Sequence, residues 1–226
     1  MEGVIAIDGP AGAGKSTIAR KLAGLLNYNY LDTGAMYRTV TLAVLRNDID
    51  PNNEKEVTKV AEEIDISFGP YSEDEGIHIY LNGENVSKDI RTCEVDKNVS
   101  TIARYNGVRQ SMVKMQRKIA FDGKIIMDGR DIGSRVLPDA EYKFYITASL
   151  EERARRRYLE VSKRTSEIDF SEVKKNIKYR DKIDRERKYS PLIKSNDAVL
   201  IDTTDLSIQE VLQKVCQYIT GDEKDE

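Results

Sequence analysis

The segment Gly9–Thr17, with the sequence GPAGAGKST, constrains this chain more than any other feature. It follows the apolar run Val4–Ile7 directly, and beyond Lys15 the apolar residues recur at helical spacing. A G-x-x-x-x-G-K-S motif between a buried strand and an amphipathic helix is typical of a loop whose backbone N–H groups surround phosphate oxygens. The alternative is a glycine-rich turn with an incidental lysine, which is much rarer in this context.

The residue types within the loop indicate distinct tasks. Gly9, Gly12 and Gly14 allow the backbone to turn its N–H groups inward. Lys15 places a positive charge near the outer phosphates of a nucleotide, and Ser16 offers a hydroxyl to Mg²⁺. The sequence therefore predicts an ATP-binding loop made of Gly9, Pro10, Ala11, Gly12, Ala13, Gly14, Lys15, Ser16 and Thr17.

Composition and charge narrow the class of protein. With 226 residues, 39% of them hydrophobic, the chain can form one large core with an excursion, or two smaller domains. A net charge of −3 argues against a general nucleic-acid binder, which is broadly basic. No apolar run is long enough to span a membrane, and two isolated cysteines without a signal-peptide pattern predict a cytoplasmic protein. We therefore expect small-molecule partners, with no nucleic acid and no membrane among them.

Short apolar strands alternate with helical stretches along the chain. Bounded runs of this kind favour a parallel sheet flanked by helices, which is an α/β fold. The strand candidates are Val4 to Ile7, the segment around Tyr30 and Leu31, Ile125 to Met127, Phe144 to Ile146, and Ala198 to Ile201. A capping box of Ser207 with Glu210 predicts the start of the last helix.

One segment interrupts this alternation. The hydrophobic pattern changes from the helical period to period 2 in Ile64–Phe68 and again in Ile77–Leu81, and Asn82–Gly83 then supplies a hairpin turn. A small antiparallel sheet is therefore predicted as an insertion. Such an insertion either helps to hold the acceptor of a phosphoryl group or decorates the fold without touching a substrate.

An arginine-rich helical segment follows the fourth strand candidate. Ser149 and Glu152 form a second capping box at its start. At i, i+4 spacing, Glu152 is expected to pair with Arg156 and Glu151 with Arg155. The arginines exceed what these glutamates can pair, so the segment is either a solvated helix or a lid that clamps a phosphoryl group. The candidate lid arginines are Arg153, Arg156 and Arg157.

Asp128 stands at the carboxyl end of the strand candidate Ile125–Met127 and begins the sequence DGRD. In a doubly wound sheet such a position lies beside the glycine loop, where a carboxylate can orient Mg²⁺ or its waters. The alternative is that Asp128 caps the turn that follows. Together with Ser16, Asp128 makes up the predicted metal site.

Five motifs, in order over nearly the whole chain, resemble those of the bacterial cytidylate kinases. They are Gly9–Thr17, Leu31–Arg38, Ile90–Val95, Asp128–Asp131 and Arg180–Leu192. The resemblance implies a P-loop nucleoside monophosphate kinase fold with a five-stranded parallel sheet. It also implies a core of residues 1–32 and 106–226, an acceptor-binding domain of residues 33–105 with an antiparallel insert near 64–87, and a helical lid at 150–170.

The activity implied by the resemblance is transfer of the γ-phosphoryl group of ATP, with Mg²⁺, to CMP or dCMP. The products are ADP and CDP or dCDP, and the expected working form is a monomer. Two alternatives remain open from the residues themselves. One is a kinase for another nucleoside monophosphate, and the other is a nucleotide-dependent switch that turns over no second substrate.

The resemblance also assigns residues to the site. Lys15, Arg38, Arg130 and Arg187 are the implied catalytic residues. The implied acceptor-phosphate residues are Tyr37, Arg38, Arg130 and Arg187, the cytosine residues are Ser100, Arg109 and Asp131, and the ribose residues are Thr33, Arg180 and Asp184.

Physical chemistry supports these assignments. A carboxylate such as Asp131 accepts a hydrogen bond from the amino group of cytosine, whereas uracil presents a carbonyl oxygen there, so we expect discrimination against UMP. Converging arginines suit a phosphate because their planar forks make bidentate, charge-assisted hydrogen bonds. The acceptor phosphate has a second pKa of about 6 and is largely an oxyanion at neutral pH, so no general base is required.

Overall fold

The computed structural model describes residues 1, 3–72, 76–162 and 168–221. Residues 73–75 of the predicted insertion and residues 163–167 of the predicted lid lie outside this description. The chain divides into two compact units. The first unit is Met1–Leu31 with Ala120–Glu226, and the second unit is Asp32–Ile119.

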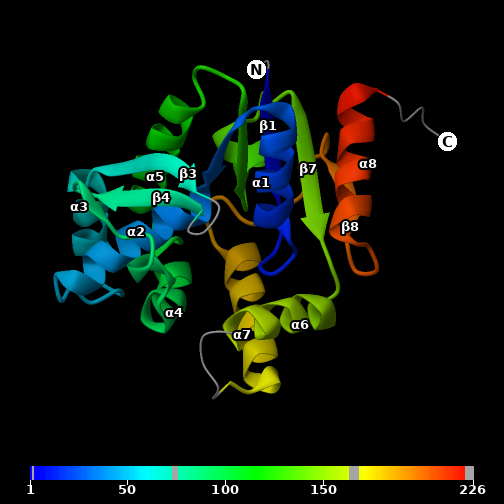
Figure 1. Cartoon of the computed structure of the whole chain (residues 1–226). Coiled ribbons are helices and arrows are strands. Elements are labelled where there is room, and N and C mark those ends of the chain that lie inside the picture. The colour runs from blue at the N-terminus through cyan, green and yellow to red at the C-terminus, as the bar shows by residue number, and fades with distance from the viewer. Residues whose placement is uncertain (2, 73–75, 163–167, 222–226) are drawn as a thin grey trace. The chain divides into compact units, whose positions relative to one another are not determined.

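A five-stranded sheet of order β2-β6-β1-β7-β8 is built at the centre of the first unit. Its strands are β1 (Val4–Asp8), β2 (Asn29–Asp32), β6 (Ile125–Gly129), β7 (Tyr142–Thr147) and β8 (Val199–Asp202). β1 pairs in parallel with both β6 and β7, and β7 pairs in parallel with β8. All the strand candidates and the α/β fold class are thus confirmed (Figure 1).

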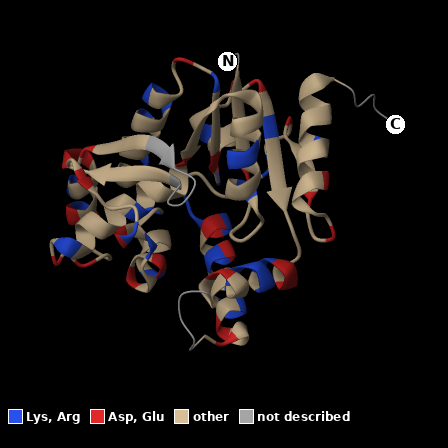
Figure 2. Ribbon diagram, viewed as in Figure 1, with Lys and Arg blue, Asp and Glu red and all other residues tan. Residues whose placement is uncertain are grey.

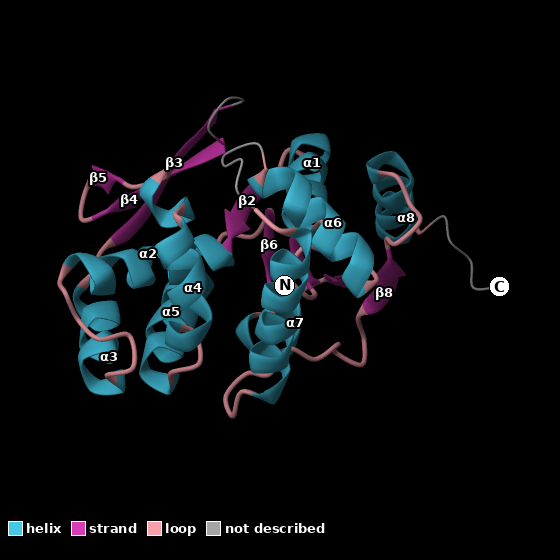
Figure 3. Ribbon diagram, turned by 90° about the horizontal axis from the view of Figure 1, so that it is seen from below, coloured by secondary structure: helices cyan, strands magenta, loops and turns pink. Residues whose placement is uncertain are grey.

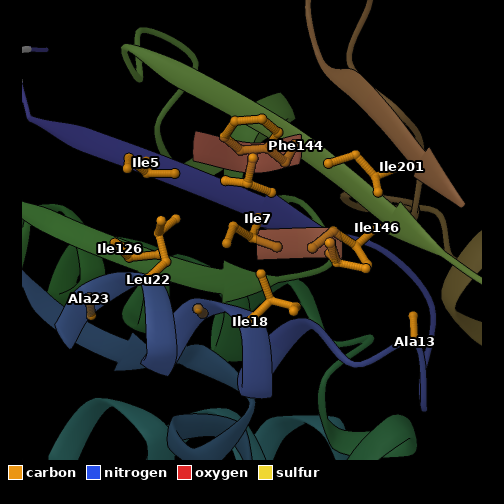
Figure 4. Packing of buried hydrophobic residues seen from close by; sticks show 13 residues of the cluster. Ile5, Ile7, Ala13, Ile18, Leu22, Ala23, Ile126, Phe144, Ile146 and Ile201 are labelled. Carbon is orange, nitrogen blue, oxygen red and sulfur yellow. The ribbon is translucent and has the colours of Figure 1, made fainter. Parts of the chain in front are cut away.

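Helices α1 (Lys15–Leu26) and α8 (Ile208–Thr220) pack on the sheet and close its main core. Ile7 of β1, Phe144 of β7 and Leu22 of α1 are buried together there (Figure 4). Every residue of β1 is buried, so the side chains on both faces of the strand are covered. This is the pattern of a parallel sheet with helices on both faces. The predicted capping box at the start of α8 is confirmed by reciprocal hydrogen bonds between its two residues.

Two further helices, α6 (Leu150–Val161) and α7 (Phe170–Glu186), pack against each other in the first unit (Figure 3). Ala154, Val173 and Ile177 form a small apolar cluster of their own. Lysine, arginine, aspartate and glutamate are spread along both helices (Figure 2). This pairing explains how a strongly charged helix such as α6 is held: its apolar contacts are with α7.

The ion pairs of α6 differ in part from the predicted ones. Glu152 pairs with Arg156 as expected, with 2.8 Å between Oε1 and Nε. The predicted pair of Glu151 with Arg155 is wrong. Glu151 pairs with Lys174 of α7, while Arg155 pairs with Glu152, because packing against α7 offers Glu151 a partner that helical spacing cannot reveal.

In its described residues, the second unit contains four α-helices, a short 3₁₀ turn and an antiparallel sheet of order β3-β4-β5. The elements are α2 (Thr33–Arg46), α3 (Glu54–Glu63), β3 (Ile66–Ser72), β4 (Gly76–Leu81), β5 (Glu84–Asn85), η1 (Asp89–Arg91), α4 (Cys93–Ile102) and α5 (Asn106–Ile119). α5 belongs to this unit because it packs on α3 and α2, although the resemblance placed residues 106–119 with the core.

The predicted antiparallel insertion is confirmed. Asn82 and Gly83 have φ angles of 51° and 84°, so they form the tight two-residue turn that their sequence favours. The short β5 after this turn pairs with β4, and the sequence pattern alone did not predict it. None of the helices in the described part of the chain combines the length and the hydropathy needed to cross a bilayer.

Replacing Leu22 by alanine tests the core. Leu22 is 0% exposed, so the change removes buried apolar contacts and leaves a cavity. We expect it to lower the free energy of unfolding by about 2–5 kcal/mol, measured by urea denaturation. Leu25→Ala on the same helix is the matched control, because Leu25 is 65% exposed and should change stability by at most about 0.5 kcal/mol. Similar losses in the two variants would contradict the packing of α1.

Candidate active site

The glycine loop joins β1 to α1, and its backbone requires glycine. Gly9, Gly12 and Gly14 have φ angles of 143°, 77° and 89°, which side chains other than glycine rarely adopt. A Cβ on Gly9 would lie 1.9 Å from the carbonyl oxygen of Ile146, and one on Gly12 would lie 2.9 Å from that of Arg153. The loop is therefore packed closely between β7 and α6. Its end leads directly into the N-terminus of α1, where backbone N–H groups favour an anion.

Lys15 is buried at the start of α1, with 5% of its surface exposed. Its Nζ donates a hydrogen bond to the carbonyl oxygen of Pro10 at 2.8 Å. Burial, and then the charge of Arg130, lower the pKa of Lys15 to about 7, against the attraction of Asp128. An anion bound nearby would favour the protonated form. The ammonium group is thus placed where a phosphate would stabilise it.

Ser16 and Asp128, the predicted metal ligands, are direct neighbours. Ser16 Oγ donates a hydrogen bond to Asp128 Oδ2 at 2.8 Å, and the hydroxyl of Tyr30 donates to Asp128 Oδ1 at 2.7 Å. Asp128 is only 4% exposed, so these bonds fix its orientation. A hydroxyl and a carboxylate oxygen side by side fit Mg²⁺, which prefers hard oxygen ligands and completes its shell with phosphate and water.

A cluster of arginines and aspartates joins the segment after β6 to the end of α7. Arg130 Nε lies 2.9 Å from Asp184 Oδ2. Arg187 lies 3.7 Å from Asp184 and 3.6 Å from Asp131, measured between Nη1 and Oδ1 and between Nη2 and Oδ1. Burial works against ionisation of Asp184, yet Arg130 and Arg187 hold its pKa below the ordinary value. Four predicted acceptor-site residues therefore meet here, and Arg180 lies one turn earlier on α7.

The other predicted acceptor-site residues lie in the second unit. Arg38 Nη1 is 2.7 Å from Asp96 Oδ1. The guanidinium of Arg109 lies over the ring of Tyr37, 5.3 Å from its centroid, and its Nη1 donates to the carbonyl oxygen of Ala103 at 3.1 Å. Each unit thus holds its own predicted residues, and those of the second unit are Thr33, Tyr37, Arg38, Ser100 and Arg109.

Arg153, a candidate lid residue, is almost fully buried between α6, α7 and the glycine loop. Its Nη1 lies 2.7 Å from Asp181 Oδ2 and donates to the carbonyl oxygen of Ala11 at 3.1 Å. Its Nε donates to the carbonyl oxygen of Ala148 at 2.9 Å. Arg153 therefore ties the glycine loop to both helices.

The other two candidate lid arginines differ from each other. Arg156 Nη1 donates to the carbonyl oxygen of Ala13 at 3.4 Å and to Thr203 Oγ1 at 2.9 Å, and its Nη2 donates to the carbonyl oxygen of Thr203 at 2.6 Å. Arg157 pairs with Glu160 on α6 itself, with 2.9 Å between Nη1 and Oε2. Arg153 and Arg156 thus contact the glycine loop, whereas the ion pair of Arg157 with Glu160 lies within α6.

Sequence reasoning missed several residues that shape this region. Tyr30 donates a hydrogen bond that orients Asp128, Thr203 accepts a hydrogen bond from Arg156, and Asp181 forms an ion pair with Arg153. Asp8 is buried at the end of β1 and accepts hydrogen bonds from a turn far along the chain. The available signal for Asp8 was an aspartate that ends an apolar strand and directly precedes the glycine loop. The other three residues carry no such local signal.

The strand, glycine loop and helix, with Lys15 buried beside the Ser16–Asp128 pair, define a P-loop phosphotransferase. A solved structure of an uncharacterized protein from Eubacterium ventriosum has the same fold. It aligns over 98% of this chain and 99% of its own, with a TM-score of 0.54 and 15% identity.

The particular family follows from the sequence relatives. A family model described as cytidylate kinase matches residues 5–221. A protein named cytidylate kinase from Caldanaerobacter subterraneus is 50% identical, over 98% of this chain and 96% of its own. Another of that name from Clostridioides difficile is 51% identical, over 96% of this chain and 97% of its own. The chain belongs to the cytidylate kinase family, so the resemblance and the phosphotransferase class predicted from the motifs are confirmed.

Replacing Arg153 by alanine tests the contact between α6, α7 and the glycine loop. The change leaves Asp181, which is 6% exposed, as a buried charge without this partner. We expect the free energy of unfolding to fall by about 3–5 kcal/mol in a denaturant titration. Arg155→Ala is the matched control: its side chain is 60% exposed and should contribute at most about 0.5 kcal/mol. A loss as small as that of the control would show that the buried pair is unimportant.

Proposed function

We propose that the protein transfers the γ-phosphoryl group of ATP, with Mg²⁺, to CMP and dCMP, forming ADP and CDP or dCDP. The observation that carries this proposal is the buried Lys15 ammonium at the start of α1, in a chain that belongs to the cytidylate kinase family. Such a cation, fixed among backbone N–H groups, stabilises the charge that develops on a phosphoryl group in transfer.

On the donor side, the whole glycine loop binds the phosphates of ATP in this proposal. Lys15 contacts the outer phosphates, and its protonated form becomes more stable as they bind. Ser16 and Asp128 hold Mg²⁺, which when bound neutralises phosphate charge. Their present hydrogen bond supports the proposal, since it keeps both oxygen atoms at one place beside the loop.

On the acceptor side, arginines bind the phosphate of CMP. Arg130 and Arg187 now pair with aspartates, and Arg38 pairs with Asp96. Buried and partly buried guanidinium groups need such counter-charges, and a phosphate oxyanion can take the place of a carboxylate with bidentate, charge-assisted hydrogen bonds. The nucleophile is then an oxygen that is already ionised, so these residues act by binding and positioning. Tyr37 completes the proposed phosphate site.

Base and sugar recognition are proposed for the remaining residues. Asp131 accepts a hydrogen bond from the cytosine amino group, while Ser100 and Arg109 donate to the opposite edge of the base. Thr33, Arg180 and Asp184 serve the ribose hydroxyls. The burial of Asp131, 3% exposed, supports this proposal, because a desolvated carboxylate discriminates strongly against a base that offers it no donor.

The domain roles are part of the same proposal. By function, residues 1–32 and 106–226 make up the core, which in this proposal includes α5 although α5 packs within the second compact unit. Residues 33–105 bind the acceptor, and residues 150–170 form the lid. The bonds of Arg153 and Arg156 to carbonyl oxygens of the glycine loop support a place for α6 beside the donor nucleotide. We also propose that the protein works as a monomer in the cytoplasm, where both nucleotide substrates occur.

Lys15→Ala tests the donor site. We expect kcat to fall by about 10²–10³-fold or more, because the loop loses the cation that faces the transferring group. Thermal denaturation should show a folded protein. The control Lys21→Ala changes an exposed lysine of the same helix and should leave kcat within about twofold. Turnover of Lys15→Ala near that of the control would remove Lys15 from catalysis. ADP release in a coupled assay with ATP, Mg²⁺ and CMP is the measurement.

Asp131→Ala tests base recognition in a panel of CMP, dCMP, UMP and AMP. For the unchanged protein, we expect CMP and dCMP to be the preferred acceptors. The variant should lose at least about tenfold of the kcat/KM ratio of CMP over UMP, because the desolvated acceptor for the amino group is gone. An unchanged ratio would exclude Asp131 from base recognition.

The same panel separates the alternative functions. A kinase for another nucleoside monophosphate would prefer UMP or AMP over CMP. A nucleotide-dependent switch would hydrolyse ATP slowly, at a rate independent of every acceptor. Either result in the unchanged protein would overturn the proposed activity.

A further inference from the structure

Asp8, the last residue of β1, anchors a turn that begins more than a hundred residues later. Its Oδ1 accepts a hydrogen bond from the backbone N–H of Ile132 at 2.8 Å, and its Oδ2 accepts one from that of Gly133 at 2.8 Å. These two N–H groups begin η2 (Ile132–Val136), a single π-helical turn. Asp8 therefore caps this turn from a different strand, using both oxygen atoms of its carboxylate.

The Asp8 carboxylate lies in the protein interior, where hydrogen bonds to a charged group are strongest. Asp8 is 5% exposed. Burial raises the pKa of Asp8 to about 6, against the lowering effect of its two backbone hydrogen bonds. The charge of Asp131 raises this pKa further, and the charge of Lys15 lowers it. The Asp8 carboxylate therefore lies close enough to both residues for their charges to act on it. Charge-assisted bonds in a desolvated place hold their geometry firmly.

The backbone is fixed on both sides of Arg130 and Asp131. Gly129, on one side, is paired with Asp8 in the register of β1 and β6. Ile132, on the other side, is held by the Asp8 carboxylate. Arg130 and Asp131 make up the chain between these points, and Gly9 of the loop follows Asp8 directly. One residue thus connects the start of the glycine loop to both flanks of the segment.

We propose that Asp8 is a positioning residue, which holds Arg130 and Asp131 in register with the glycine loop and thereby sets acceptor recognition. The inference rests on the proposed function, in which these two residues contact CMP. In this role Asp8 acts through Arg130 and Asp131 and is not itself proposed to contact a substrate. Its effect should therefore appear in the binding and choice of the acceptor, while ATP binding, which depends on the glycine loop itself, is largely kept.

Asp8→Asn is the decisive variant, because it keeps the shape of the side chain. Its amide group replaces one acceptor oxygen by a donor, which then faces a backbone N–H and loses that bond. We expect KM for CMP to rise by about tenfold or more and the preference for CMP over UMP to fall, with KM for ATP within about twofold. The control Asp122→Asn alters an exposed aspartate of the same unit and should change none of these values.

Hydrogen exchange gives a readout that needs no turnover. In the nucleotide-free protein, the amides of Ile132 and Gly133 should exchange at least about tenfold faster in Asp8→Asn than in the unchanged protein or in Asp122→Asn. Unchanged exchange would overturn the anchoring. A uniform rise of KM for ATP, CMP and UMP would overturn the positioning role and leave only a general effect on stability.

The outcomes also separate this inference from the proposed function. If the unchanged protein fails to phosphorylate CMP, the proposed function is wrong. The hydrogen-exchange experiment then still decides whether Asp8 anchors the turn. Should Asp8→Asn be too unstable for kinetics, Asp8→Glu takes its place, because it keeps the charge but displaces the carboxylate by one methylene. The same order of KM effects is expected for it, and equal effects on all three substrates would again contradict positioning.

Discussion

Charge buried at the carboxyl edge of the parallel sheet is the constraint on which the site of the first unit depends. Asp8, Lys15, Asp128 and Asp184 are each at most 6% exposed. Such groups are costly to desolvate unless hydrogen bonds and opposite charges surround them. The fold supplies these partners from β1, β6, α1 and α7, elements whose own packing is apolar. The stability of the core thus maintains an arrangement of charges that would not persist by itself.

In the proposed function, arginine–aspartate pairs keep the acceptor-phosphate residues in place before the substrate binds. Arg130 pairs with Asp184 in the first unit, and Arg38 pairs with Asp96 in the second. A partly buried arginine without a counter-charge is less stable and less well oriented than one that is already paired. If a doubly charged phosphate replaces a carboxylate there, as proposed, the protein exchanges one charge-assisted contact for another. The proposed selectivity then comes from geometry, since any oxyanion provides charge but only a nucleotide also reaches Asp131.

Patterns that are local in the sequence predicted most of this fold, whereas contacts between residues far apart in the sequence were not predicted. The strands, the glycine loop, the Ser207 cap and the Asn82–Gly83 turn each depend on residues a few positions apart, so spacing and residue type reveal them. Asp8 bonds to amides 124 and 125 positions away. Glu151 likewise finds Lys174 on another helix, not the arginine that helical spacing offers. Tertiary packing decides such partners, and a single sequence does not show it.

A loop that turns its N–H groups inward must direct carbonyl oxygens elsewhere, and this explains the contacts around it. The carbonyl oxygens of Pro10, Ala11 and Ala13 accept hydrogen bonds from Lys15, Arg153 and Arg156. Each peptide unit is a dipole, so a cation at its carbonyl end favours the orientation in which the N–H end faces an anion. The arginines of α6 can therefore strengthen phosphate binding without touching the phosphate, simply by holding the outer side of the loop. This accounts for a charged helix that holds two of its arginines, Arg153 and Arg156, against the glycine loop.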